Sequence, residues 1–238
     1  MRSGRRKKVA QRAAPTKFDP CPPGAIGGQY KPLSETEVQQ VYDTAVRLLS
    51  ELGMGEVPER LTQDLLNNGA TISGERILFP KKMIERAIKT APKQFTLHGR
   101  DPNRSIHIGG DRVHFGTGGA AVQTLDIDTA QYRPSTLEDL HHFTRLQDAL
   151  RNVSWFTRCC VATDVPDNFD LDVNTVFALL KNTTKPVATS FTIAPHVAPI
   201  VRMLDIAAGG EGEFAKRPFL KAHISPVISP LRYAEDAV

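Results

Sequence analysis

After residue 150 the sequence repeats one unit, an apolar segment followed by a segment with helical periodicity. The apolar segments begin near residues 154, 186 and 219, about 32 residues apart. This spacing is typical of consecutive βα units, whose strands lie parallel. The segments are apolar at most positions, as strands covered on both faces require. The repeat therefore predicts an α/β fold that is either an open doubly wound sheet or a (β/α)8 barrel.

The chain divides into three parts. Residues 1–32 are basic and then rich in Pro and Gly, which predicts a disordered tail and an extended strap. Residues 33–110 predict a small mixed α/β cap, and residues 111–238 carry the βα units. At most four strands can be placed, whereas a barrel needs eight, so we expect the first half of a longer barrel.

Local signals predict individual elements. Ser34 and Glu37 form a capping box for a helix that ends at Gly53, and Ser135 and Glu138 form a second box for a helix to residue 150. Further helices are expected over 58–69, 80–92, 170–182 and 194–210, and from 229 onward. Hairpins are expected over 71–79 and 122–134, short strands over 95–119, and strands over 154–164, 185–192 and 217–226.

Charge and cysteine content exclude several classes of protein. The net charge is +4, but residues 1–17 alone contribute +7, so the remainder is mildly acidic. No aromatic residue interleaves the basic ones, and we expect no nucleic-acid partner. No apolar run approaches the roughly 18–20 residues of a membrane span. The adjacent Cys159 and Cys160 match no zinc spacing, so we expect no metal site and a reducing, cytoplasmic setting.

Candidate site residues follow from the rule that ligands bind at the carboxyl ends of parallel strands. The string HFGTGG ends one such strand and brings Phe115, Gly118 and Gly119 to that edge. These glycines either let a ligand approach the backbone or serve a tight turn or close strand packing. They are not a dinucleotide fingerprint, because position 121 is Ala and strand-like sequence follows.

The later strand ends supply polar and aromatic candidates. Asp164 binds a cation or polar group, or else caps the next helix or turn. Phe191 and Thr192 follow the next strand. His223 either positions a substrate and moves a proton or is a buried, hydrogen-bonded histidine, and Ser225 lies beside it.

Four segments in order resemble the trimethylamine methyltransferase family of corrinoid-dependent enzymes. They are YKPLSETEVQQVYDTAVRLLSELG, ERILFPKKMIERAIKTAPKQFTLHGRDP, HFGTGGAAVQTLDIDTAQYRPSTLEDL and SPVISPLRYAEDAV, which together span residues 29–238. The resemblance implies a (β/α)8 barrel. It also implies transfer of a methyl group from trimethylamine or a related quaternary amine to the cobalt of a cognate corrinoid protein. The corrinoid (cobalamin) would be carried by that partner and not bound directly by this chain.

The resemblance assigns no catalytic residue within these 238 residues. It implies a homo-oligomer for the full-length protein. A methylated amine suits aromatic faces and a carboxylate, and Phe115, Phe191 and Asp164 are the residues of those types near the strand ends. Two alternatives stay open: a non-catalytic amine-binding module and an inactive, truncated half-barrel.

Overall fold

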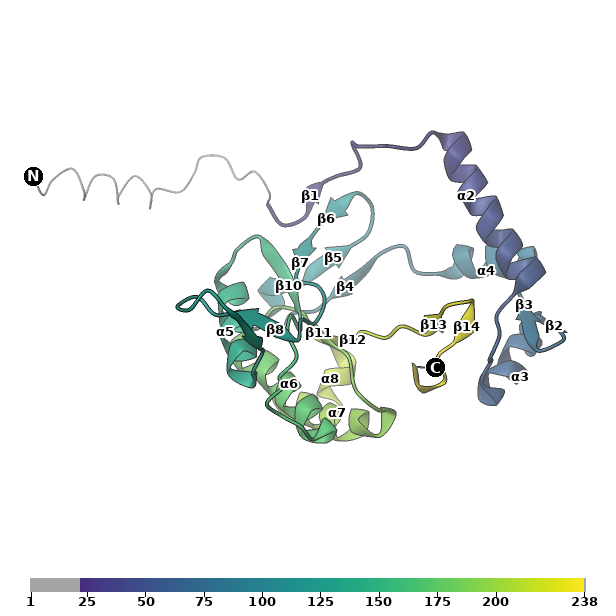
Figure 1. The fold of residues 1–238 in the computed structure, drawn as a ribbon. Helices are drawn as coiled ribbons and strands as arrows, with labels where there is room; N and C mark the ends of the chain where they lie inside the picture. Colours follow the sequence, from purple (N-terminus) through teal and green to yellow (C-terminus); the bar gives the residue numbers. More distant parts are fainter. Residues whose placement is uncertain (1–21, 238) are drawn as a thin grey trace, which may run out of the picture.

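A four-stranded parallel sheet forms the centre of the computed structural model, which describes residues 22–237 (Figure 1). The strands lie in the order β7, β10, β11, β12, so each new strand is added beside the previous one. Phe156 pairs with Val187, and Val187 pairs with Leu220, all in parallel register. The predicted α/β fold with parallel βα units is confirmed; residues 22–237 do not close a barrel. The strands are β7 (Phe115–Gly116), β10 (Val153–Thr157), β11 (Val187–Thr189) and β12 (Leu220–Ala222).

Helices follow the strands and bury the apolar core against the sheet. One cluster joins Leu140, Phe156 and Leu179, and a second joins Val176, Ile200 and Phe219. Burial of these side chains is the main favourable contribution to folding. The helices are α5 (Leu137–Ala149), α6 (Asn168–Asn182), α7 (Val197–Ala208), which continues a 3-10 turn at Ala194–His196, and the short α8 (Glu213–Lys216).

The N-terminal helices and hairpin lie to one side of the sheet (Figure 1). Ser34 and Glu37 make the predicted capping box. The helix that they open ends in a π-helical turn, Leu48–Leu52, before Gly53. The elements are α2 (Glu35–Arg47), α3 (Glu59–Asn67), β2 (Thr71–Ser73), β3 (Arg76–Leu78) and α4 (Lys81–Thr90).

Short antiparallel pairs of strands precede and follow β7 in the chain. The expected hairpin over 122–134 is present, and its turn is held by Asp126, which accepts hydrogen bonds from the backbone and hydroxyl of Thr129. A 3-10 turn, Pro102–Arg104, links β4 to β5. The pairs are β1 (Ala25–Ile26) with β6 (Arg112–Val113), β4 (Phe95–Leu97) with β5 (Ile106–Ile108), and β8 (Gln123–Leu125) with β9 (Tyr132–Pro134).

Three predictions of elements were wrong. The second capping box lies one residue later, at Thr136 and Asp139, because the Ser135 hydroxyl donates to carbonyl oxygens of neighbouring loops. The strand predicted over 154–164 ends at Thr157. The helix predicted from 229 is instead a hairpin, β13 (Val227–Ile228) with β14 (Arg232–Tyr233), followed by a 3-10 turn, Glu235–Ala237.

The predicted basic tail at residues 1–17 lies outside the described residues. Across residues 22–237, no helix combines the length and apolar character needed to cross a membrane.

Candidate functional site

A cavity of about 1030 Å³ lies at the carboxyl ends of β10, β11 and β12. We call it the carboxyl-end cavity. This is the edge at which parallel α/β folds bind their ligands. Its sheet wall comes from residues 119–120, 157–158, 189–192 and 223–225, and its opposite wall from residues 56–59, 228, 233–235 and 237.

The opposite wall joins the segment around residues 55–59 to the last segment of the described chain. Gly55 donates its N–H to the Leu231 carbonyl at 2.9 Å, and Tyr233 donates to the Gly55 carbonyl at 3.1 Å. The Arg76 guanidinium also donates to Leu231 at 3.0 Å. Arg232 pairs with Glu56 at 2.7 Å. The hairpin β13–β14 is thereby fixed to the N-terminal part, and the two close the cavity together.

The sheet wall carries a half-buried arginine that sequence reasoning did not identify. Arg158 follows β10 directly, and its backbone N–H donates to the Ala188 carbonyl at 2.9 Å. Its guanidinium donates to the Ser190 hydroxyl at 3.0 Å. Burial lowers the pKa of Arg158 from its ordinary value, and the charge of Asp172 opposes that change. Its position at the carboxyl end of β10 could have identified it. The strand was expected to continue to residue 164, however, which placed Arg158 within the strand and not at its end.

A buried Asp–His pair supports the loop after β11. Asp172 of α6 is 1% exposed, and its Oδ2 lies 2.7 Å from His196 Nδ1. The same oxygen accepts hydrogen bonds from the backbone N–H and the hydroxyl of Thr192, both at 2.8 Å. The contacts fix the segment that brings Ser190 and Phe191 to the cavity. The sequence did contain a signal, because Asp172 falls on the apolar face of its helix, four residues before Val176.

Five of the eight candidate residues line the carboxyl-end cavity: Gly119, Phe191, Thr192, His223 and Ser225. Phe191 also packs against the second core cluster. His223 is exposed, and its backbone N–H donates to the Thr189 carbonyl at 2.8 Å. The structure thus brings together candidates from three separate loops.

The other three candidates do not line this cavity. Phe115 is 52% exposed on the edge strand β7. A Cβ atom on Gly118 would meet nothing within 4 Å, so no close neighbour requires a glycine there. Gly119 likewise has open space, but its φ of +61° favours glycine.

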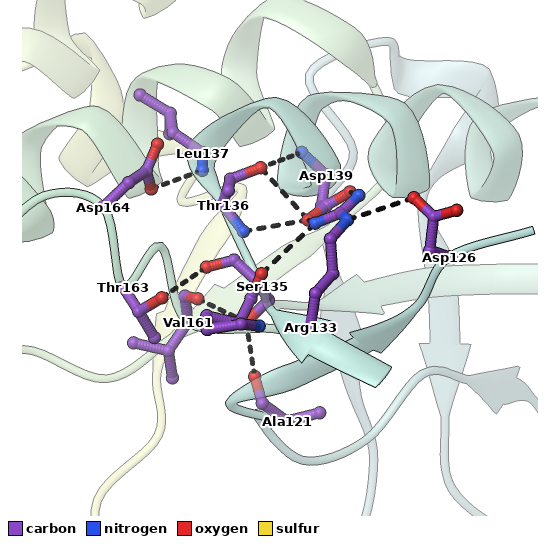
Figure 2. A network of polar contacts seen from close by, with 11 residues as sticks. Ala121, Asp126, Arg133, Ser135, Thr136, Leu137, Asp139, Val161, Thr163 and Asp164 are labelled. Carbon is purple, nitrogen blue, oxygen red and sulfur yellow. Dashed lines mark hydrogen bonds and ion pairs between the residues drawn. The ribbon is translucent and has the colours of Figure 1, made fainter. Parts of the chain in front are cut away.

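Asp164 caps a helix (Figure 2). Its Oδ1 accepts the backbone N–H of Leu137 at 2.8 Å, in the first turn of α5. A carboxylate there satisfies a free N–H group and faces the positive end of the helix dipole. The structure thus shows a cap, but on the preceding helix α5; the next helix, α6, which Asp164 was expected to cap, is capped by Asp167.

The cap belongs to a larger polar network around the start of α5 (Figure 2). The Ser135 hydroxyl donates to the Val161 carbonyl at 2.6 Å, and Thr163 donates to the Ser135 carbonyl at 2.7 Å. Arg133 binds Asp139 through two N–H groups, at 2.6 and 2.8 Å. The hydrogen bonds from Arg133 lower the pKa of Asp139 to about 2. The network joins the loop after β7 to the loop after β10.

The glycine with the tightest surroundings is Gly116. A Cβ atom there would lie 2.1 Å from the Trp155 ring, on the strand beside it. Gly116 therefore serves close strand packing, one of the two roles considered for glycines in this string. No group of three His, Cys, Asp or Glu side chains in the described part of the chain is placed to hold a metal ion.

Comparison with known families assigns the chain. The sequence model of the trimethylamine methyltransferase family (MTTB) matches residues 1–238. The chain belongs to this family. The resemblance of the four ordered segments is confirmed, and the family is one of methyltransferases.

Characterised members of the trimethylamine methyltransferase family are distant relatives. Identity is 27% over 213 residues to the glycine betaine methyltransferase of Desulfitobacterium hafniense strain Y51, covering 89% of this chain and 44% of that protein. Identity is 26% over 206 residues to the trimethylamine methyltransferase MttB of Desulfitobacterium hafniense strain DSM 10664 / DCB-2, covering 86% of this chain and 41% of that protein. The trimethylamine methyltransferase MttB1 of Methanosarcina mazei is 24% identical over 217 residues, covering 89% and 44%. The chain thus spans less than half the length of the curated relatives it matches.

Proposed function

We propose that the chain binds a methylated amine in the carboxyl-end cavity and presents its methyl group to the cobalt of a partner corrinoid protein. The cavity carries this proposal, because it lies where parallel α/β folds bind substrates and the family match covers the whole chain. Curated relatives named for glycine betaine and trimethylamine support amines of this kind as substrates.

The proposed reaction is a displacement at carbon. The electron pair of cobalt(I) attacks the methyl carbon, the C–N bond breaks, and its electron pair stays on nitrogen as the demethylated amine leaves. The contribution of this chain is to hold the N-methyl group in line and to exclude water. Phe191 offers an aromatic face for the cation, and the carboxylates of Glu59 and Glu235 lie on the opposite wall.

We further propose that the four strands are the first half of a (β/α)8 barrel with residues 33–110 as its cap. Support comes from the sequential strand order and the helix after each of β10 and β11. Within residues 22–237, the edge strands β7 and β12 each have a single neighbour in this sheet. Further strands would satisfy their free backbone groups. We place the protein in the cytoplasm.

The test is a methyl-transfer assay with the 238-residue chain, reduced cobalamin and a candidate corrinoid protein. Trimethylamine and glycine betaine are supplied separately, and the change from cobalt(I) to methylcobalt(III) absorbance is followed. We expect methylation that depends on both chain and amine. The proposal would be refuted if no methylcobalt formed with either amine, whether the acceptor was free reduced cobalamin or the corrinoid protein. Amine binding without methylation would favour a non-catalytic binding module instead.

A pair of glycine variants controls this assay. In the Gly119→Asn variant, asparagine tolerates the left-handed backbone conformation and places a side chain at the cavity wall. We expect it to lower the transfer rate about tenfold or more, since misplacing a reacting group by about 1 Å can reduce rates by about 100-fold. Gly118→Ala lies beside it but off the cavity wall, and should leave the rate unchanged.

A further inference from the structure

We propose that Arg158 binds an anionic group of the ligand, so that this residue selects a methylated amine bearing a carboxylate over one without. The inference rests on the proposed function for the amine, but the argument for the carboxylate comes from Arg158 and its surroundings alone.

Among the described residues, other half-buried arginines bind either carboxylates or, as Arg76 does, backbone carbonyls, and the Arg158 guanidinium binds neither. Arg104 pairs with Asp148, and Arg133 pairs with Asp126 and Asp139. Across residues 22–237, the Arg158 guanidinium has one hydrogen-bond partner, the neutral hydroxyl of Ser190. A guanidinium has five N–H donors in a planar fork that matches a carboxylate. Most of its hydrogen-bonding capacity is therefore left for a ligand in the cavity that it lines.

The charge of Arg158 also lacks close compensation. A partly buried charge is costly unless it is paired. Asp172 is near enough to favour the charged guanidinium, but no hydrogen bond or ion pair joins the two residues. The Asp172 Oδ2 atom binds His196 and Thr192, and its buried Oδ1 atom has no hydrogen-bond partner in the described part of the chain, Arg158 included. A bound carboxylate would supply the missing partner.

The two walls of the cavity differ in charge. The sheet wall carries the positive charge of Arg158, and the opposite wall carries Glu59, Glu56 and Glu235. Of these acids, Glu56 is paired with Arg232. A ligand that is cationic at one end and anionic at the other matches this arrangement, with its carboxylate at Arg158 and its quaternary nitrogen toward the acidic wall.

The experiment compares two quaternary cations by calorimetry on the 238-residue chain. Glycine betaine carries a carboxylate, and tetramethylammonium does not. We expect the chain to bind glycine betaine more tightly. Arg158→Gln should weaken glycine betaine binding by about 10- to 100-fold, the range for a charge-assisted hydrogen bond, and change tetramethylammonium binding less than about threefold.

Two further variants separate recognition from structure. Arg158→Lys keeps the charge but not the fork, and should lose part of the preference for glycine betaine. Lys221→Gln is the matched control, because Lys221 lies on β12 with its ammonium group over the Trp155 ring and does not line the cavity. It should keep the wild-type preference. A thermal melt of each variant shows whether it is folded.

Several outcomes would overturn the inference. One is that the wild type binds the two cations equally or binds neither. Another is that a folded Arg158→Gln loses affinity for both cations equally, which would make Arg158 a structural residue. If Arg158→Gln does not fold, an unchanged preference in Arg158→Lys overturns it. Failed methyl transfer with the carboxylate preference intact would refute the proposed function and leave the role of Arg158 standing.

Discussion

Gly116 and Gly118 lie two residues apart in the same string, yet their surroundings differ. A Cβ at position 116 would overlap the Trp155 ring, whereas one at position 118 meets open space. We expect Gly116→Ala to lower the free energy of unfolding by about 1–3 kcal/mol, as overpacking does. Gly118→Ala should change it by less than about 0.5 kcal/mol. Urea denaturation of both variants tests this, and equal effects would contradict it.

The candidate site was predictable from sequence only on one of its walls. The strand-end rule identified Gly119, Phe191 and His223, because parallel strands bring their carboxyl ends to a shared edge. It could not identify Glu59 or Tyr233, which reach the cavity through contacts between segments far apart in the chain. Proximity of that kind leaves no periodic signal in the sequence.

Helix α5 shows how a cap couples an element to its surroundings. Thr136 and Asp139 form the capping box, while Arg133 and Asp164 bind to the same turn (Figure 2). We expect Asp139→Asn to destabilise the fold by about 1–2 kcal/mol at neutral pH, through loss of the cap and of an ion pair that is partly screened by solvent. Glu138→Gln, one residue earlier and exposed, is the control and should have little effect. Thermal denaturation of both variants measures this. A larger loss of stability in Glu138→Gln than in Asp139→Asn would contradict the assignment of Asp139 to the capping box.

The same turn predicts a dependence of stability on pH. Hydrogen bonds from Arg133 lower the pKa of Asp139 from 3.8 to about 2. Because the folded pKa lies below the unfolded one, the unfolded chain takes up a proton first as the pH falls. The stabilisation is complete above about pH 4 to 5 and is lost toward pH 2. Denaturation between pH 2 and 6 should show a shallower loss for Asp139→Asn than for the wild type, and parallel curves would contradict this.

Elements were predictable where the local sequence determines them. The Ser34 box and the Pro-bounded helix before Ala91 depend on neighbours within one turn, and both formed as expected. The box at Ser135 was misplaced by one residue because Val161, distant in sequence, accepts the Ser135 hydroxyl. The expected C-terminal helix did not form where Leu231 and Tyr233 hydrogen-bond to the backbone of Gly55. Tertiary partners override local preference in both cases.

At the scale of the whole molecule, the cavity depends on a junction between distant segments. The sheet supplies one wall, and β13–β14 with residues 56–59 supplies the other. Few side chains of the second wall are buried, whereas those of the sheet lie in two apolar clusters. Segments with few buried contacts open most readily, so we expect the second wall to be the mobile side of the site.

Arg76 is the residue on which this junction most depends. Its guanidinium donates to the carbonyls of Leu52 at 2.8 Å, Gly53 at 2.8 Å and Leu231 at 3.0 Å. Replacing it with Met keeps the apolar stem and leaves these carbonyls without their charged donor, at a cost of about 1.5–3 kcal/mol. That cost corresponds to amide exchange about 10- to 100-fold faster in residues 227–235.

Hydrogen exchange measured by mass spectrometry tests Arg76→Met against Arg47→Met, whose ion pair with Glu51 lies on an exposed helix face. The Arg47 variant should leave residues 227–235 unchanged, because it removes a pair that contributes little. Amides of α6 should stay protected in both variants, since its core contacts lie away from the junction. If Arg76→Met left exchange in 227–235 unchanged, the backbone pairing of Gly55 with Leu231 and Tyr233 would suffice to hold the wall. Ligand affinity in the Arg76 variant should fall only if the open form becomes as populated as the closed form, because the apparent affinity is proportional to the fraction of time that the wall is closed.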